Sequence, residues 1–165
     1  MTSIEPSAPT PVATPKRTPV SQDSDNAGLS EALVVEHSTI YGYGIVLALS
    51  PPNANSLVVD ALIQHRQRRD DIIVMLTARR VSPPVAASGY QLPMLVGSAA
   101  DAARLAVRME NDGATAWRAV AEHAETADDR TFAAMALAQS AVMAARWNKM
   151  LGAWPITTTF PGSNE

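Results

Sequence analysis

The side chains best suited to chemistry in this chain are four polar residues in otherwise apolar helical rows: Glu36, His65, Glu110 and Gln139. Carboxylates and imidazoles that point inward from separate helices are how helical bundles hold iron or manganese ions. A two-metal site of this kind takes one Glu from each of two helices and a Glu-x-x-His motif from each of the others. The residue types therefore point first to a metal site, and a count of ligands has to support it.

The ligand count falls short of a two-metal site. The residue three before His65 is Leu62 rather than Glu, and no Glu-x-x-His motif occurs in the chain. Gln139 is neutral, and the absence of cysteine excludes thiolate ligands and disulfides. Glu36, His65 and Glu110 could hold one iron or manganese ion at most. A metal-binding oxidoreductase or iron-handling protein that uses these three residues is therefore the alternative hypothesis.

The favoured interpretation is a buried polar network that needs no cofactor and contains no catalytic residue. Desolvating an ion costs on the order of several kcal/mol, so buried charges have to be paired. Two arginines in the same helical rows are available to neutralise the two carboxylates. The predicted cluster consists of Glu36, His65, Arg69, Glu110, Gln139 and Arg146. On this interpretation we do not expect the protein to be an enzyme.

Four helices are predicted from the 3.6-residue spacing of apolar side chains. They cover about residues 29–49, 56–80, 98–124 and 128–152. Ser98 with Asp101 resembles a capping box, and Gly152 suits a helix C-terminus. In the fourth helix the predicted inward row contains Met135 and Val142. Because no stretch alternates convincingly with period two, we expect an all-α fold.

The predicted connections between the helices are short, long and short. Residues 50–55 and 125–129 are too short for anything but a tight reversal, whereas 81–97 could extend by about 3.3 Å per residue along a whole helix. Two antiparallel hairpins joined by one long crossover are typical of a ferritin-like four-helix bundle. The loop lengths therefore predict that bundle.

The composition indicates one domain and argues against some classes of binding partner. Residues 1–26 contain five prolines and no spaced apolar side chains, so we expect a disordered tail before a domain at 27–165. There is no uninterrupted apolar segment for a signal peptide or a membrane span. The net charge of −3 argues against nucleic-acid binding. We expect a cytoplasmic protein with no membrane or nucleic-acid partner.

The pattern Tyr41-Gly42-Tyr43-Gly44 lies inside the first predicted helix, where each glycine costs up to about 1 kcal/mol relative to alanine. Close packing against Trp117 or Trp147 would explain the glycines. A small pocket lined by Tyr41, Tyr43 and Trp117 is the other explanation.

Several different short motifs are distributed along residues 28–162. They are Glu36-His37, Tyr41-Gly42-Tyr43-Gly44, His65-Arg66, Arg69-Asp70, Tyr90-Gln91-Leu92-Pro93, Glu110, Trp117-Arg118, Arg146-Trp147 and Phe160-Pro161-Gly162. In combination they resemble an actinobacterial ferritin-like domain of unknown function. The resemblance implies a ferritin-like four-helix bundle and carries over no catalytic residue. We therefore expect a non-catalytic binding or structural protein whose ancestral metal site is replaced by a Glu/His/Arg network. It would form a homo-oligomer through a helix face or through the segment at Trp154-Pro155.

Overall fold

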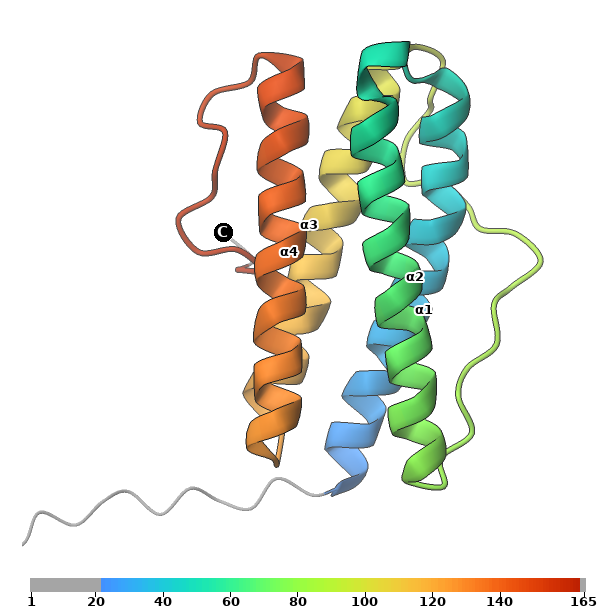
Figure 1. Ribbon diagram of the computed structural model, residues 1–165, viewed down its shortest axis with the longest axis vertical. Helices are drawn as coiled ribbons and strands as arrows, with labels where there is room; N and C mark the ends of the chain where they lie inside the picture. Colours follow the sequence, from blue (N-terminus) through green and yellow to red (C-terminus); the bar gives the residue numbers. More distant parts are fainter. Residues whose placement is uncertain (1–21, 164–165) are drawn as a thin grey trace, which may run out of the picture.

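The predicted helices form a bundle in the computed structural model, which describes residues 22–163 (Figure 1). The elements are α1 (Gln22–Leu49), the short 3-10 helix η1 (Pro52–Ala54), α2 (Asn55–Ala78), α3 (Ala99–His123) and α4 (Ala127–Leu151). No strand occurs between residues 22 and 163. The prediction of an all-α helical bundle is therefore confirmed.

The helix ends follow the capping chemistry of the sequence. The Ser98 hydroxyl accepts a hydrogen bond from the backbone N–H of Asp101 at 3.1 Å, which caps α3 as predicted. Thr126 caps α4 in the same way, through the backbone N–H of Asp129 at 3.0 Å. Gly152 ends α4 with φ at +67°, a conformation that glycine adopts without steric cost.

The first helix begins earlier than predicted. Residues 22–26 belong to α1, so the boundary of the disordered tail at residue 26 is wrong; the remainder of the predicted tail, residues 1–21, lies outside the described residues. The extra turn is anchored by Arg79 at the end of α2. Its guanidinium bonds Asp25 at 2.8 Å and Asp129 at 2.6 Å, which ties the starts of α1 and α4 together. This long-range ion pairing was not visible in local sequence.

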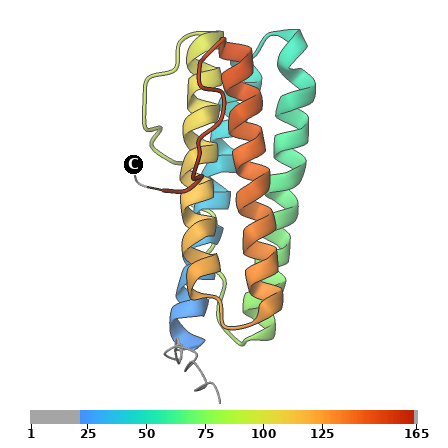
Figure 2. The ribbon, with the colours of Figure 1, turned by 90° about the vertical axis from the view of Figure 1, so that its left-hand side faces the viewer.

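The helices pack unevenly. α3 makes extensive contact with both α1 and α4, and α1 packs against α2, whereas α2 and α4 scarcely touch. The connection from residue 79 to 98 runs outside the bundle from the lower end of α2 to the upper end of α3 (Figure 1). After α4, the chain turns back and descends beside that helix (Figure 2). This descending piece, residues 153–163, is called the C-terminal segment below.

Two apolar clusters fill the bundle. One surrounds Tyr43 and Trp147, and the other surrounds Leu29 and Trp117. In α4 the predicted inward row is wrong, because Met135 and Val142 are each 59% exposed. The buried row of α4 lies one position further along the chain: Ala133, Ala136, Ser140, Met143, Ala144 and Trp147. Alanines satisfy either row, so only packing against α3 decides between them.

One helix of the described residues, α1 from Asp23 to Leu49, is long and apolar enough to cross a membrane by length and composition alone. A core helix of a bundle meets the same criterion, and 44% of the apolar window is buried inside the protein. α1 also buries Glu36 and packs against two other helices. Apolar side chains of α1 such as Leu29, Leu33 and Val46 therefore belong to the core of the bundle, whereas Val34 and Leu47 are exposed.

Candidate functional site: a buried charge network

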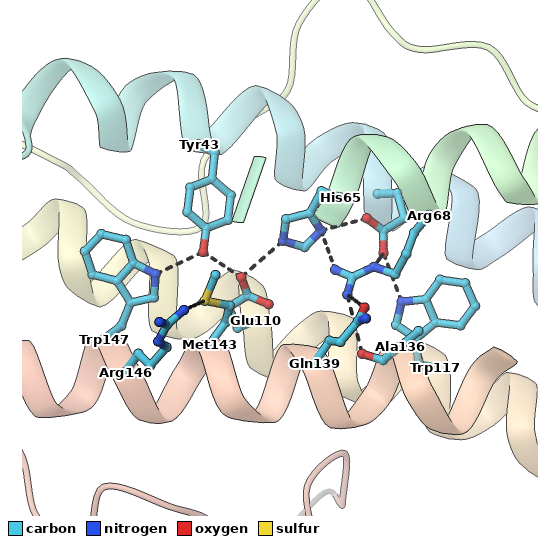
Figure 3. A network of polar contacts seen from close by, with 11 residues as sticks. Tyr43, His65, Arg68, Glu110, Trp117, Ala136, Gln139, Met143, Arg146 and Trp147 are labelled. Atoms are coloured by element: carbon cyan, nitrogen blue, oxygen red, sulfur yellow. Dashed lines mark hydrogen bonds and ion pairs between the residues drawn. The ribbon is translucent and has the colours of Figure 1, made fainter. Parts of the chain in front are cut away.

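The structure brings Glu36, His65 and Glu110 together in the centre of the bundle, between the two apolar clusters. Glu36 comes from α1, His65 from α2 and Glu110 from α3. None of these side chains is more than 2% exposed. Figure 3 shows how further residues from these helices and from α4 extend the contacts in both directions. Three helices thus contribute an ionisable group to one point in the interior.

His65 bridges the two carboxylates. Its Nδ1 lies 2.7 Å from Oε2 of Glu36, and its Nε2 lies 3.1 Å from Oε1 of Glu110. Burial by itself lowers the pKa of His65, but the hydrogen bonds to Glu110 and Glu36 and the attraction of both carboxylates raise this pKa above 6.5. Because both ring nitrogens face carboxylate oxygens, the protonated imidazolium, which donates from both, fits the geometry.

Glu36 accepts hydrogen bonds from three directions. Besides His65, it receives the Nε–H of Arg68 at 2.9 Å and the indole N–H of Trp117 at 2.9 Å, both on Oε1. Burial raises the pKa of Glu36, but the hydrogen bond and charge of His65, the charge of Arg68 and the Trp117 bond outweigh it. The pKa is lowered below 4.5. The carboxylate is therefore held in its ionised form.

Arg68 is the cation that sequence reasoning did not assign. Only 4% exposed, it also donates from Nη1 to the side-chain oxygen of Gln139 at 3.2 Å. Its Nη2 lies 2.7 Å from Nδ1 of His65, the nitrogen that also faces Glu36. Nδ1 can donate a proton to Glu36 or, when it carries no proton, accept an N–H from Nη2 of Arg68, but it cannot do both. The raised pKa of His65 favours the protonated form, in which Nδ1 donates to Glu36 and both cations share this carboxylate.

A second branch of the network leads from Glu110 to α4. The Tyr43 hydroxyl donates to Oε1 of Glu110 at 2.6 Å and accepts the indole N–H of Trp147 at 3.0 Å (Figure 3). Burial and then the charge and hydrogen bond of Glu110 raise the pKa of Tyr43 well above 10. The hydroxyl is thus a fixed donor to the carboxylate.

The network is electrically balanced. Glu36 and Glu110 supply two negative charges, and His65 and Arg68 supply two positive charges. The hydrogen bonds extend from the Trp117 indole N–H, which Glu36 accepts, at one end to the Trp147 indole N–H, which Tyr43 accepts, at the other. Such an arrangement offers pairing and orientation rather than a free base or nucleophile.

The donor set does not fit a metal ion. Both ring nitrogens of His65 face carboxylate oxygens, so neither lone pair is directed to a cation, and Oε1 of Glu36 already accepts from Arg68 and Trp117. Within the network, Oε2 of Glu110 is the atom that is buried with no hydrogen-bond partner among its protein neighbours. Across residues 22–163, no group of three or more His, Asp or Glu side chains is arranged to hold a metal.

Three members of the predicted cluster lie elsewhere or only at its edge. Arg69 is partly exposed and pairs with Asp70 at 2.8 Å, and Arg146 is exposed and pairs with Asp60 at 3.4 Å. Gln139 is also exposed, although it accepts the bond from Arg68. The expected pairing of the carboxylates with Arg69 and Arg146 is therefore wrong.

The error has a simple geometric cause. Arg68 follows His65 by three residues and Arg69 follows it by four, so both positions lie one helical turn from His65. Local spacing cannot choose between them. The adjacent α4 decides, because Arg68 is the residue that reaches its Gln139 and Ala136.

The two helical glycines also differ from the expectation. A Cβ on Gly42 would collide with the side chain of Met109, rather than with a tryptophan, whereas a Cβ on Gly44 would meet nothing within 4 Å. Tyr41 is exposed and packs against Tyr90 with the rings tilted by 54° and their centroids 5.5 Å apart. Tyr43 instead belongs to the buried network. The glycine pattern thus serves close packing at one position only.

Fold and site together define a class: a four-helix bundle whose core contains a charge-balanced Glu/His/Arg network. The chain belongs to the family described as a domain of unknown function (DUF4439), whose model matches residues 28–165. It is similar to the crystal structure of a conserved hypothetical protein from Mycobacterium tuberculosis. The two are 74% identical with a TM-score of 0.79, over 79% of this chain and 99% of the other. Among curated proteins, none matches the chain significantly.

Proposed function

We propose that this protein is a non-catalytic binding or structural protein with a ferritin-like fold, in which a Glu/His/Arg network occupies the position of an ancestral metal site. Two short connections flank one long crossover, which is the loop order of ferritin-like bundles. The observation that carries the proposal is the position of His65 between the two carboxylates. There its imidazolium, with the guanidinium of Arg68, supplies the positive charge that metal ions supply in di-iron bundles.

Self-association through a helix face remains part of the proposal. Exposed apolar side chains lie on α2 and α4: Ile63 and Val74 on α2, and Met135 and Val142 on α4. Sedimentation velocity of the full chain over a range of concentrations tests this part. A single monomeric species at all concentrations would contradict it.

The competing function is a metal-dependent oxidoreductase or iron-handling protein. One observation favours it, because the three ligands it requires do converge, and Oε2 of Glu110 has no partner among its protein neighbours. The occupied nitrogens of His65 and the adjacent guanidinium of Arg68 count against it. Binding a cation there would require His65 to lose its proton and turn away from one carboxylate.

Elemental analysis separates the two functions. The full chain is purified without a metal-affinity column, dialysed against iron(II) or manganese(II), and compared with Glu36→Ala and Glu110→Ala. We expect no stoichiometric metal in any of the three proteins and a large loss of stability in both variants. Stoichiometric iron or manganese that disappears in both variants would overturn the structural proposal.

A further inference from the structure

A groove lies between α4 and the C-terminal segment. Its cavity volume is about 340 Å³, within the range of about 300–1,000 Å³ that is usual for small-molecule sites. Small side chains of α4 form its floor, and Ile156 and Pro161 of the C-terminal segment face them. The floor consists of Ala141, Val142, Ala144 and Ala145. The groove is therefore mainly apolar.

The C-terminal segment that covers the groove is fixed near both of its ends. At one end the side-chain amide of Asn148 donates to the backbone carbonyl of Ile156 at 3.2 Å. At the other end Gly162 lies so close to α3 that a Cβ would be 2.6 Å from the carbonyl oxygen of Ala114. Gly162 also has φ at +79°, which favours glycine. The intervening residues thus bridge the groove as an anchored strap.

The charge of the groove lining is entirely positive. Among its lining residues, Arg146 and Lys149 are the ionisable ones, and no carboxylate is present. Arg146 has a distant partner in Asp60 at 3.4 Å, but no carboxylate of the described residues pairs with Lys149. By contrast, Arg104, Arg108 and Arg118 on α3 each pair with a neighbouring acid. In a chain of net charge −3, the groove has a cation without its counter-charge.

We propose that this groove binds a small anionic amphiphile, a monocarboxylate with a medium-length hydrocarbon body. The hydrocarbon would cover the alanine floor beneath Ile156 and Pro161, and the carboxylate would pair with the Lys149 ammonium. The hydroxyls of Thr157 and Thr158, which also line the groove, are available as hydrogen-bond donors. The site gives the proposed binding function a ligand class, and it shares no residue with the buried network.

Titration calorimetry with decanoate as the probe tests the ligand class. We expect saturable 1:1 binding to the full chain, with decanol weaker and decyltrimethylammonium weaker still. Lys149→Gln should weaken decanoate about tenfold, the ratio expected for the loss of one charge-assisted hydrogen bond, and leave decanol unchanged. Arg66→Gln is the matched control, because Arg66 is an exposed cation on α2. Absence of saturable binding, or equal binding of decanoate and decanol, would overturn the proposal.

A steric variant tests the location. Ala145→Phe places a ring on the groove floor and should abolish decanoate binding, whereas Ala134→Phe, at an exposed position about three turns earlier in the same helix, should not. Unchanged circular dichroism and unfolding midpoints establish that both variants are folded. Decanoate binding that survives Ala145→Phe would overturn the assignment to this groove. Neither result depends on metal content, so this proposal and the structural role of the network can fail separately.

Discussion

Arg68 and Arg69 form a natural test of the buried network, because they are neighbours in sequence and differ in surroundings. Arg68→Met keeps an unbranched side chain of similar length but removes the charge beside Glu36. Two buried carboxylates would then face the single imidazolium of His65. Removing one partner of a buried ion pair costs about 3–5 kcal/mol of unfolding free energy. For a chain of this size, that loss corresponds to a fall of about 6–20 °C in the unfolding midpoint.

The control is Arg69→Met. Arg69 is 30% exposed and its partner Asp70 is 59% exposed, so this surface pair should contribute only about 0–1 kcal/mol. Urea denaturation followed by tryptophan fluorescence measures both variants, since Trp117 and Trp147 are buried. Equal losses in the two variants, or a larger loss for Arg69→Met, would refute the assignment of Arg68 to the network.

A double-mutant cycle isolates the interaction itself. Glu36→Gln removes a negative charge, and combined with Arg68→Met it leaves one carboxylate, Glu110, opposite one imidazolium, His65. Charge balance is then restored. The double variant should lose less stability than the sum of the single variants, by about 0.5–3 kcal/mol. Strict additivity would show that the two side chains do not interact in the folded protein.

Two further predictions concern pH and glycine. Because the pKa of Glu36 is lowered from 4.5 and that of His65 is raised from 6.5, their stabilisation should be fully present between pH 4.5 and 6.5. It should be lost below that range as Glu36 is protonated and above it as His65 loses its proton. Urea denaturation at a series of pH values measures this, and a flat profile above pH 6.5 would contradict it. Gly44→Ala should raise the unfolding free energy by about 0.5–1 kcal/mol. Gly42→Ala should not, because its Cβ would meet the side chain of a methionine; thermal unfolding of the two variants compares them.

Most helix boundaries could be predicted from the sequence, because the residues that cap or end a helix lie close to its ends. Pro51 and Pro52 end the first helix, Ser98 caps the third, and Gly152 ends the fourth, as the structure has them. The boundary that differs by more than two residues is the start of α1, where an ion pair joins residues 54 positions apart in sequence. Local helix propensity depends on nearby residues only, so it cannot predict such a contact.

The residues of the buried network could be predicted only in part from the sequence. Glu36, His65 and Glu110 stand out in sequence because each is an ionisable residue in an apolar row, and burial of a charge in such a row requires a partner. The sequence does not show which basic residue is the partner of these carboxylates. Arg68 and Arg69 satisfy the same helical spacing, and alanines on both faces of α4 left its rotation undetermined, so Gln139 and Arg146 were placed too far inward.

The sequence by itself thus determined most of the helix ends, the all-α class and the three residues at the centre of the network, because capping and periodicity act within a few residues. Only the tertiary structure decided which arginine neutralises them and which face of α4 is buried. It also decided that the C-terminal segment encloses a cationic groove. Those outcomes depend on contacts between helices, where a rotation of one residue exchanges a buried side chain for an exposed one.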